Sequence, residues 1–336
     1  MRLFKYLSVL ILFVLIYLYI PRESDRLLYF PKKENRYFCN YLTKQKLPIN
    51  FVDCAILKFI DTKEGWIRSS GVLNKIDIYK MALSKKIKKL RVIPVYSGDN
   101  IDTLAQKISK QTSIDKNKLL ATYKKLAKFK DGAIVAKKYK IPYNATANSI
   151  MAYMLSSSEE LFKSFGDIDS KEFKDKLIIA SIIQKETHNK KEMPIVASVI
   201  YNRLKKNMKL QMDATLNYKE FSNKIVTPQR IKNDKSRYNT YKHKGLIPQP
   251  LCMVGIDALK AAFSPAKTDF LYFVKSKNSH KFSKKYATHQ KEVRAYKRSL
   301  YRNKTLKVLR EGITLNLPMP IYLPLILPFD DTFKLK

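Results

Sequence analysis

Glu186 is the acidic residue whose surroundings best suit proton transfer. Residues 173–187 have the spacing of a helix, and Ile178, Ile182 and Glu186 fall on one i, i+4 row of it. A carboxyl group at the end of an apolar stripe is partly desolvated, which raises its pKa. Such a group is useful as a general acid near neutral pH. The simpler alternative is a helix-end glutamate that points to water or pairs with Lys190.

Polar side chains on the loops and helix ends that follow form a second set of candidates. They are Asn202, Gln211, Asn239 and Tyr241, with Asp213 as a nearby carboxylate. Amide and hydroxyl groups both donate and accept hydrogen bonds, and tyrosine rings stack on sugar faces, so the set suits sugar binding. Taken singly, each residue would equally fit a turn or a cap.

Two helices and one loop must position Glu186. The helix over 173–187 ends near it, and a loop over 187–193 follows. Pro194 then fits the first position of a helix, where its missing N–H is not needed. Residues 195–204 continue as an apolar helix.

A smaller unit precedes this region. Residues 91–96 are β-rich, although Pro94 restricts them to a short or edge strand. Helical spacing follows over 101–108 and 116–128, and residues 133–139 can form a returning strand. This β-α-α-β order resembles the LysM fold, which binds amino-sugar glycans. Many other small α+β units have the same order.

An apolar run opens the chain. Tyr6–Ile20 carries no charge, and Lys5 can snorkel from a helix end, so residues 1–20 are expected to form an uncleaved membrane anchor. The alternatives are a signal peptide, which lacks its small-residue cleavage site here, and a core helix. The flanking charges do not decide on which side of the membrane the rest lies.

The chain is strongly basic. Lys and Arg total 66 against 28 Asp and Glu, for a formal net charge of +38, which attracts anionic membranes and polymers. The basic residues are spread along the chain and match no nucleic-acid-binding motif, so we expect no nucleic-acid partner. A content of 45% hydrophobic residues excludes global disorder.

Neither metal nor cofactor is expected. The sequence has no dinucleotide-binding or P-loop motif, and its four histidines form no ligand set. Cys39, Cys54 and Cys252 fit neither a disulfide framework nor a zinc pattern, although Cys39 and Cys54 could pair in an exported domain.

Nine motifs in order closely resemble the MltG/YceG-like endolytic murein transglycosylases. They are ASIIQKET (180–187), IYNRL (200–204), LQMDAT (210–215), YNTY (238–241), GLIP (245–248), DALKAA (257–262), PAKT (265–268), LYFV (271–274), and HKF (280–282) with His289. The resemblance covers about 175–293 and is weaker over 90–165.

The residue patterns and the resemblance together predict an α+β fold with five segments, of which the C-terminal tail has no counterpart in the family. These are a transmembrane anchor (1–20), a membrane-proximal region (21–89), a LysM-like subdomain (90–150), a YceG-like catalytic domain (151–310) and a proline-rich tail (311–336). The resemblance also implies a single-pass protein of the cell inner membrane with its catalytic domain in the periplasm. The implied partners are peptidoglycan glycan strands, membrane lipid and peptidoglycan synthases.

The implied activity is cleavage of the MurNAc–GlcNAc β-1,4 bond of nascent strands without water, which leaves 1,6-anhydro-MurNAc ends and limits strand length. Glu186 matches the family's catalytic glutamate and would act alone as acid and then base, where ordinary glycosidases use two carboxylates. Gln211, Asn239 and Tyr241 would stabilise charge and orient the sugar, and Asp213 would support them. Asn202 is a further substrate-binding candidate.

Some positions depart from the family pattern. Gln184 stands where a glutamate is frequent, Gln249 where a glycine is usual, and residues 253–255 differ from the family's loop. If the missing glutamate tunes the catalytic pKa, the pH optimum would differ. Two other functions remain open. A non-catalytic peptidoglycan-binding scaffold would tolerate loss of Glu186, and a membrane-tethered nucleic-acid-binding protein is suggested only by the charge.

Overall fold

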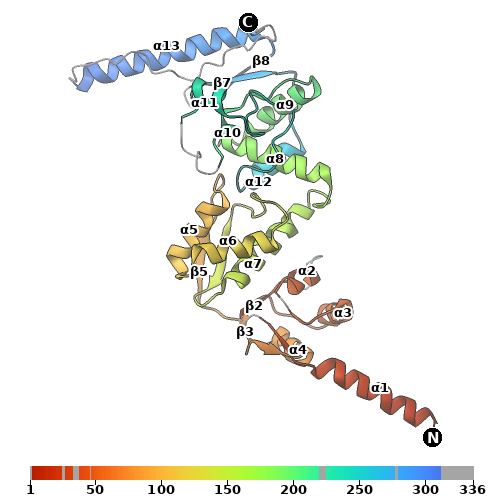
Figure 1. The fold of residues 1–336 in the computed structure, drawn as a ribbon. Coiled ribbons are helices and arrows are strands. Elements are labelled where there is room, and N and C mark those ends of the chain that lie inside the picture. Colours follow the sequence, from red (N-terminus) through yellow and green to blue (C-terminus); the bar gives the residue numbers. More distant parts are fainter. Residues whose placement is uncertain are drawn as a thin grey trace. The chain divides into compact units, whose positions relative to one another are not determined.

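A computed structural model describes residues 2–24, 27–32, 38–45, 47–218, 225–276 and 279–311. Figure 1 shows its helices and strands, which form two compact units. The first unit comprises Met1–Lys174 and Cys252–Ile256, and the second comprises Asp175–Leu251 and Asp257–Lys336. The predicted segment boundaries at 20, 89, 150 and 310 stay predictions. The proline-rich tail expected over 311–336 lies almost entirely outside the described residues.

The first helix is α1 (Arg2–Tyr19), which coincides with the expected anchor. A search of the described residues finds no helix that combines the length and the apolar character needed to cross a membrane. The anchor is therefore not confirmed. At the C-terminal end of α1, the Tyr17 hydroxyl lies 2.9 Å from Asn50 Oδ1, and the Lys75 ammonium lies 3.3 Å from the centre of the Tyr17 ring.

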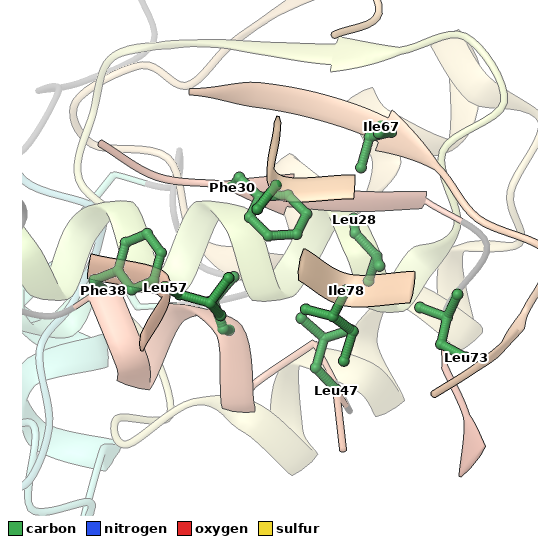
Figure 2. Packing of buried hydrophobic residues seen from close by; sticks show 10 residues of the cluster. Leu28, Phe30, Phe38, Leu47, Leu57, Ile67, Leu73 and Ile78 are labelled. Carbon is green, nitrogen blue, oxygen red and sulfur yellow. The ribbon is translucent and has the colours of Figure 1, made fainter. Parts of the chain in front are cut away.

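Residues 22–83 have their own hydrophobic core. Its elements are β1 (Arg22–Glu23), β2 (Leu27–Phe30), α2 (Phe38–Thr43), α3 (Phe51–Phe59), β3 (Gly65–Arg68), β4 (Val72–Leu73) and α4 (Lys75–Leu83). The strands form two antiparallel pairs, β1 with β4 and β2 with β3. Figure 2 shows Leu28, Phe30 and Ile67 of the β2–β3 pair packing with residues of the helices. All three cysteines are free thiols, so the pairing of Cys39 with Cys54 is not observed.

The expected β-α-α-β unit is present, with one strand placed differently. It consists of β5 (Leu90–Pro94), α5 (Ile101–Thr112), α6 (Lys116–Leu126) and β6 (Lys138–Pro142), and β5 pairs antiparallel with β6. The returning strand predicted over 133–139 is wrong for most of its length. Residues 133–135 are apolar and buried, as strand residues would be, but they lie in a loop. In this loop the Val135 N–H donates to Ser158 Oγ (3.0 Å). The likeness to LysM stays a prediction.

The segment 252–256 belongs to this first unit through backbone hydrogen bonds. The Met253 N–H donates to the Asp99 carbonyl (2.7 Å), and the Gly98 N–H donates to the Met253 carbonyl (2.9 Å). The Ala136 N–H donates to the Val254 carbonyl (2.9 Å). The loop that departs from the family pattern therefore lies against the β-α-α-β unit. Helix α7 (Ala147–Lys163) also belongs to the first compact unit.

The second unit is mostly helical. Its elements are α8 (Lys171–Glu186), which begins in the first unit, α9 (Met193–Lys205), α10 (Asp213–Leu216), α11 (Pro228–Asn233), α12 (Ile256–Phe263), the antiparallel hairpin β7 (Tyr272–Ser276) and β8 (Ser279–Ser283), and α13 (Tyr286–Glu311). The apolar faces of α8, α9 and α12 are buried. This confirms the two helices expected around Glu186, each to within two or three residues.

Candidate active site

Glu186 is the last residue of α8, at the end of the stripe that the sequence indicates. Ile178 and Ile182 on the same row are buried, whereas Glu186 itself is half-buried. The Ala214 N–H donates to Glu186 Oε1 at 3.3 Å. Lys190 instead pairs with Asp257 (2.8 Å), so the structure does not support the alternative in which Glu186 is neutralised by that lysine.

Burial raises the pKa of Glu186 to about 7, and the negative charge of Asp213 contributes to this rise. The hydrogen bond from the Ala214 N–H acts in the opposite direction, because it favours the charged form. At neutral pH a large fraction of Glu186 is therefore protonated. A carboxyl group with such a pKa can both give and take a proton under the same conditions.

Asp213 lies at the start of α10 and is held by Tyr241. The Tyr241 hydroxyl donates to Asp213 Oδ1 at 2.5 Å. Burial raises the pKa of Asp213, while the Tyr241 hydrogen bond and the charge of Arg230 oppose that rise. Tyr241 is only 7% exposed, and burial raises the pKa of its hydroxyl, so it stays a donor. Tyr241 therefore positions Asp213, whose charge in turn acts on Glu186.

Arg203 of α9 orders the segment that leads to Asp213. Its Nε donates to the Leu271 carbonyl (2.6 Å), and its Nη1 donates to the carbonyls of Lys209 (3.2 Å) and Leu210 (2.9 Å). These bonds fix the chain just before Gln211, which has a φ of 47°. Buried arginines of this kind hold backbone that no regular element satisfies.

A threonine pair joins the two loops of the site. The Met212 N–H donates to Thr240 Oγ1 (3.0 Å), and the hydroxyls of Thr215 and Thr240 lie 2.9 Å apart. The Gln211 N–H donates to the Thr240 carbonyl (3.1 Å). The motifs at 210–215 and 238–241 are thereby brought together beside Glu186, with the Gln211 side chain partly exposed.

Asn239 is not at the surface of the site. It is fully buried, its Nδ2 donates to the carbonyls of Ile231 and Asp234 (2.8 Å each), and its Oδ1 accepts from the Tyr241 N–H (3.1 Å). Asn202 similarly donates to the carbonyls of Thr268 (2.8 Å) and Phe270 (3.0 Å). Both amides therefore bond to loop carbonyls, and their expected contact with a sugar stays a prediction.

We expect Asn239→Ala to destabilise the protein, because it leaves the carbonyls of Ile231 and Asp234 and the Tyr241 N–H without their partner. The cost is about 1–3 kcal/mol, measured as a lower free energy of unfolding by chemical denaturation. The matched control is Asn233→Ala, because Asn233 is exposed. Unchanged stability combined with lost glycan binding would instead make Asn239 a sugar contact.

Glu192 fixes the loop that follows Glu186. Its Oε1 accepts from the His280 N–H (3.0 Å), its Oε2 lies 2.7 Å from His280 Nδ1, and Thr187 Oγ1 donates to Oε2 (3.3 Å). Burial alone would raise the pKa of Glu192, but the bonds from His280 outweigh it and lower that pKa. The loop after the candidate acid is therefore tied to β8.

His280→Ala is expected to loosen this loop, since Glu192 would keep a buried charge with fewer donors. The expected loss is about 1–2 kcal/mol in the free energy of unfolding, followed by circular dichroism. His188→Ala is the control, because His188 is exposed. Equal stability of the two variants would contradict a positioning role for the Glu192–His280 pair.

A cavity of about 680 Å³ adjoins α10. Its lining residues include Thr215, Leu216, Tyr218, Arg230 and Tyr238. The rings of Tyr218 and Tyr238 are stacked, with centres 4.6 Å apart. Arg230 bonds the Leu216 carbonyl and Asn217 Oδ1 (2.9 Å), which holds the end of α10. Polar groups and aromatic rings at the end of α10, the helix whose Ala214 N–H bonds Glu186, make this a candidate ligand cavity.

Within the described parts of the chain, no three His, Cys, Asp or Glu side chains come together as metal ligands would. Arg203, Glu192 and Arg230 are structural residues of the site for which the sequence predicts no role. Arg203 lies in one of the family motifs, and His280, the partner of Glu192, lies in another. The hydrogen-bond partners of Arg203, Glu192 and Arg230, however, come from other parts of the fold. No sequence spacing could have identified them.

Comparison with known proteins gives one family and several relatives. The model of the YceG-like family matches residues 27–295. An endolytic murein transglycosylase of Bacillus subtilis is 40% identical over 121 residues, which are 36% of this chain and 34% of that protein. An endolytic murein transglycosylase of Streptococcus pneumoniae is 30% identical over 152 residues, 43% of this chain and 28% of that protein. The alignments thus span about a third of these relatives' length.

A solved structure is also similar. The crystal structure of a putative yceG-like protein from Listeria monocytogenes superimposes with a TM-score of 0.51 at 25% identity, over 79% of this chain and 97% of that chain.

Proposed function

Because this chain belongs to the YceG-like family, we propose that it is a lytic transglycosylase of peptidoglycan, a lyase in which Glu186 is the general acid and base. The relatives named as endolytic murein transglycosylases support the reaction class. The observation that carries the proposal is the pKa of Glu186, raised to about 7 by burial beside Asp213. A carboxyl group in this state can serve both proton transfers of the reaction at neutral pH.

The proposed reaction has two proton transfers and consumes no water. Protonated Glu186 gives its proton to the oxygen of the MurNAc–GlcNAc β-1,4 bond as that bond breaks at C1 of MurNAc. The Glu186 carboxylate then takes the proton from the C6 hydroxyl of the same MurNAc, whose oxygen closes on C1. The products are a free 4-hydroxyl and a 1,6-anhydro end, and Glu186 is again protonated.

Other residues support this chemistry without exchanging protons in it. Asp213, held by Tyr241, keeps the pKa of Glu186 high and places negative charge near the oxocarbenium-like centre. The partly exposed Gln211 remains the candidate to bond the sugar, and the cavity lined by Tyr218 and Tyr238 is the candidate place for neighbouring sugars.

We further propose that residues 1–20 anchor the protein in the inner membrane, with the catalytic domain in the periplasm. The uncharged run Tyr6–Ile20 supports this anchor. An anchored enzyme would meet nascent strands near peptidoglycan synthases and would terminate their elongation. Its lack of a nucleic-acid partner, metal and cofactor remains an expectation of the sequence.

The test is the chemistry of the product. The full chain in detergent is incubated with purified peptidoglycan, and new ends are identified by mass spectrometry. The expected result is 1,6-anhydro-MurNAc ends, including ends on internal fragments. Reducing ends would mean a hydrolase with a second working carboxylate. Binding of peptidoglycan without any cleavage would favour the scaffold alternative.

A further inference from the structure

A second cavity lies in the first unit. It has a volume of about 470 Å³, and its wall consists of the rings of Tyr29, Tyr41 and Tyr153. Lys137 and Ser157 also line it, and Glu64 and Glu160 are exposed residues of its lining. Its residues come from β2, α2 and α7 and from the loops after β2, before β3 and before β6, and the reaction at Glu186 uses none of them. Rings and charged groups around one hollow are typical of ligand sites.

Lys137 is the distinctive residue of this cavity. Its ammonium donates to Ser157 Oγ (2.5 Å) and lies 3.4 Å from the Ser157 carbonyl. No carboxylate of the described residues lies within 4.0 Å of it. Burial lowers the pKa of Lys137, and the more distant charge of Glu160 compensates only in part. The cavity therefore holds a partly desolvated cation that a bound anion would stabilise.

The aromatic wall is rigid. The centres of the Tyr29 and Tyr153 rings are 4.5 Å apart, and those of Tyr29 and Tyr41 are 5.6 Å apart. The Tyr41 hydroxyl donates to the Tyr153 carbonyl (3.1 Å), and the Tyr29 hydroxyl donates to Glu64 Oε1 (2.6 Å). Such fixed rings offer apolar faces to a small side chain at little cost in conformational entropy.

We propose that this cavity binds a peptide carboxylate, namely that of the stem peptide carried by a peptidoglycan strand. The carboxylate would pair with Lys137, and the adjoining amino-acid side chain would pack on the tyrosine rings. Glu64 and Glu160 would face any ammonium group of the same peptide. The identity of the peptide rests on the proposed function, since that function brings peptidoglycan to the protein. The site would make binding depend on the peptide as well as on the glycan.

The experiment measures binding in a chain that cannot cleave. Full-length protein carrying Glu186→Gln, in detergent, is titrated calorimetrically with three probes. These are a disaccharide tetrapeptide, a peptide-free glycan strand that keeps its lactyl carboxylates, and a chitin tetrasaccharide without carboxylates. We expect the first to bind at this site and Lys137→Met to weaken its binding by about tenfold or more. The matched control is Lys138→Met, because Lys138 is the exposed first residue of β6, next to Lys137, and we expect no change from it.

Three outcomes would overturn the proposal. One is equal binding of the tetrapeptide probe by Lys137→Met and by Lys138→Met. Another is peptide-free glycan that competes as well as the peptide, which would assign Lys137 to lactyl carboxylates. The third is absence of tetrapeptide binding. Thermal unfolding of Lys137→Met, expected to match the parent, excludes misfolding as the cause. Because only binding is measured, these outcomes are independent of whether the wild-type chain produces anhydro ends.

Discussion

Glu186→Gln removes the formation of 1,6-anhydro ends, with an expected loss of about 10²–10⁴ in rate. Glutamine has the shape of protonated glutamic acid but neither gives nor takes a proton at this pH. The Ala214 N–H still finds a side-chain oxygen to bond, so the loop beside it is expected to keep its place. The measurement is the rate of appearance of anhydro ends in the full-length wild type and variant on the same peptidoglycan.

The stability of Glu186→Gln shows whether the variant has lost catalysis alone or has also lost its fold. The pKa of Glu186 is about 7 in the folded protein, against an ordinary glutamate value of 4.5, so between these pH values the folded state keeps a proton that the unfolded state has released. This contribution to stability is fully present below pH 4.5 and is lost as the pH rises through 7, so that the folded state is destabilised by about 3 kcal/mol at pH 8. Glu186→Gln should therefore be at least as stable as wild type at pH 8.

Glu172→Gln is the control at the exposed start of α8, and it should retain full activity. Two results would contradict the role of Glu186. One is a Glu186→Gln variant that still cleaves at a rate near that of wild type. The other is a variant that unfolds at a lower temperature than wild type at pH 8, which would contradict a site that disfavours the charged form of this carboxyl group.

The features that follow from local periodicity could be predicted from the sequence. The i, i+4 row of Ile178, Ile182 and Glu186 gave both the helix and the half-buried carboxyl group, because a helix repeats on one face every three to four residues. The order of the β-α-α-β unit was found in the same way. In 133–135, however, an apolar run belongs to a buried loop, and burial alone does not distinguish a strand from a loop.

The roles of single polar residues could not be predicted. Asn239 and Tyr241 are both polar residues of one motif, but the fold buries the amide among backbone carbonyls and brings the phenol to Asp213. Glu192 and His280 are 88 residues apart in sequence and meet only because β8 passes the loop after α8. Such contacts depend on tertiary packing, which a single sequence does not reveal.

Asp213→Asn is expected to change the pH dependence of the reaction rate more than it changes the maximal rate. The charge of Asp213 contributes to the raised pKa of Glu186, so its removal lowers that pKa, while burial still holds it above the usual range. The general acid must be protonated, and the fall of activity on the alkaline side should therefore begin at lower pH. We expect a displacement of on the order of one pH unit, which corresponds to about 1.4 kcal/mol and a roughly tenfold lower rate at pH 8.

Tyr241→Phe is expected to change the pH dependence in the same way as Asp213→Asn, but to a smaller extent. The Tyr241 hydroxyl favours the charged form of Asp213, so its loss raises the pKa of Asp213 and weakens the influence of that charge on Glu186. The alkaline limb should move in the same direction as in Asp213→Asn, but by less. The measurement is the rate of anhydro-end formation from pH 5 to pH 9 for the three proteins. If Asp213 were instead a nucleophile or a base, Asp213→Asn would be inactive at every pH, and the wild-type product would carry reducing ends. A limb that moves while the product stays anhydro would leave Glu186 as the one carboxyl group that exchanges protons with the substrate.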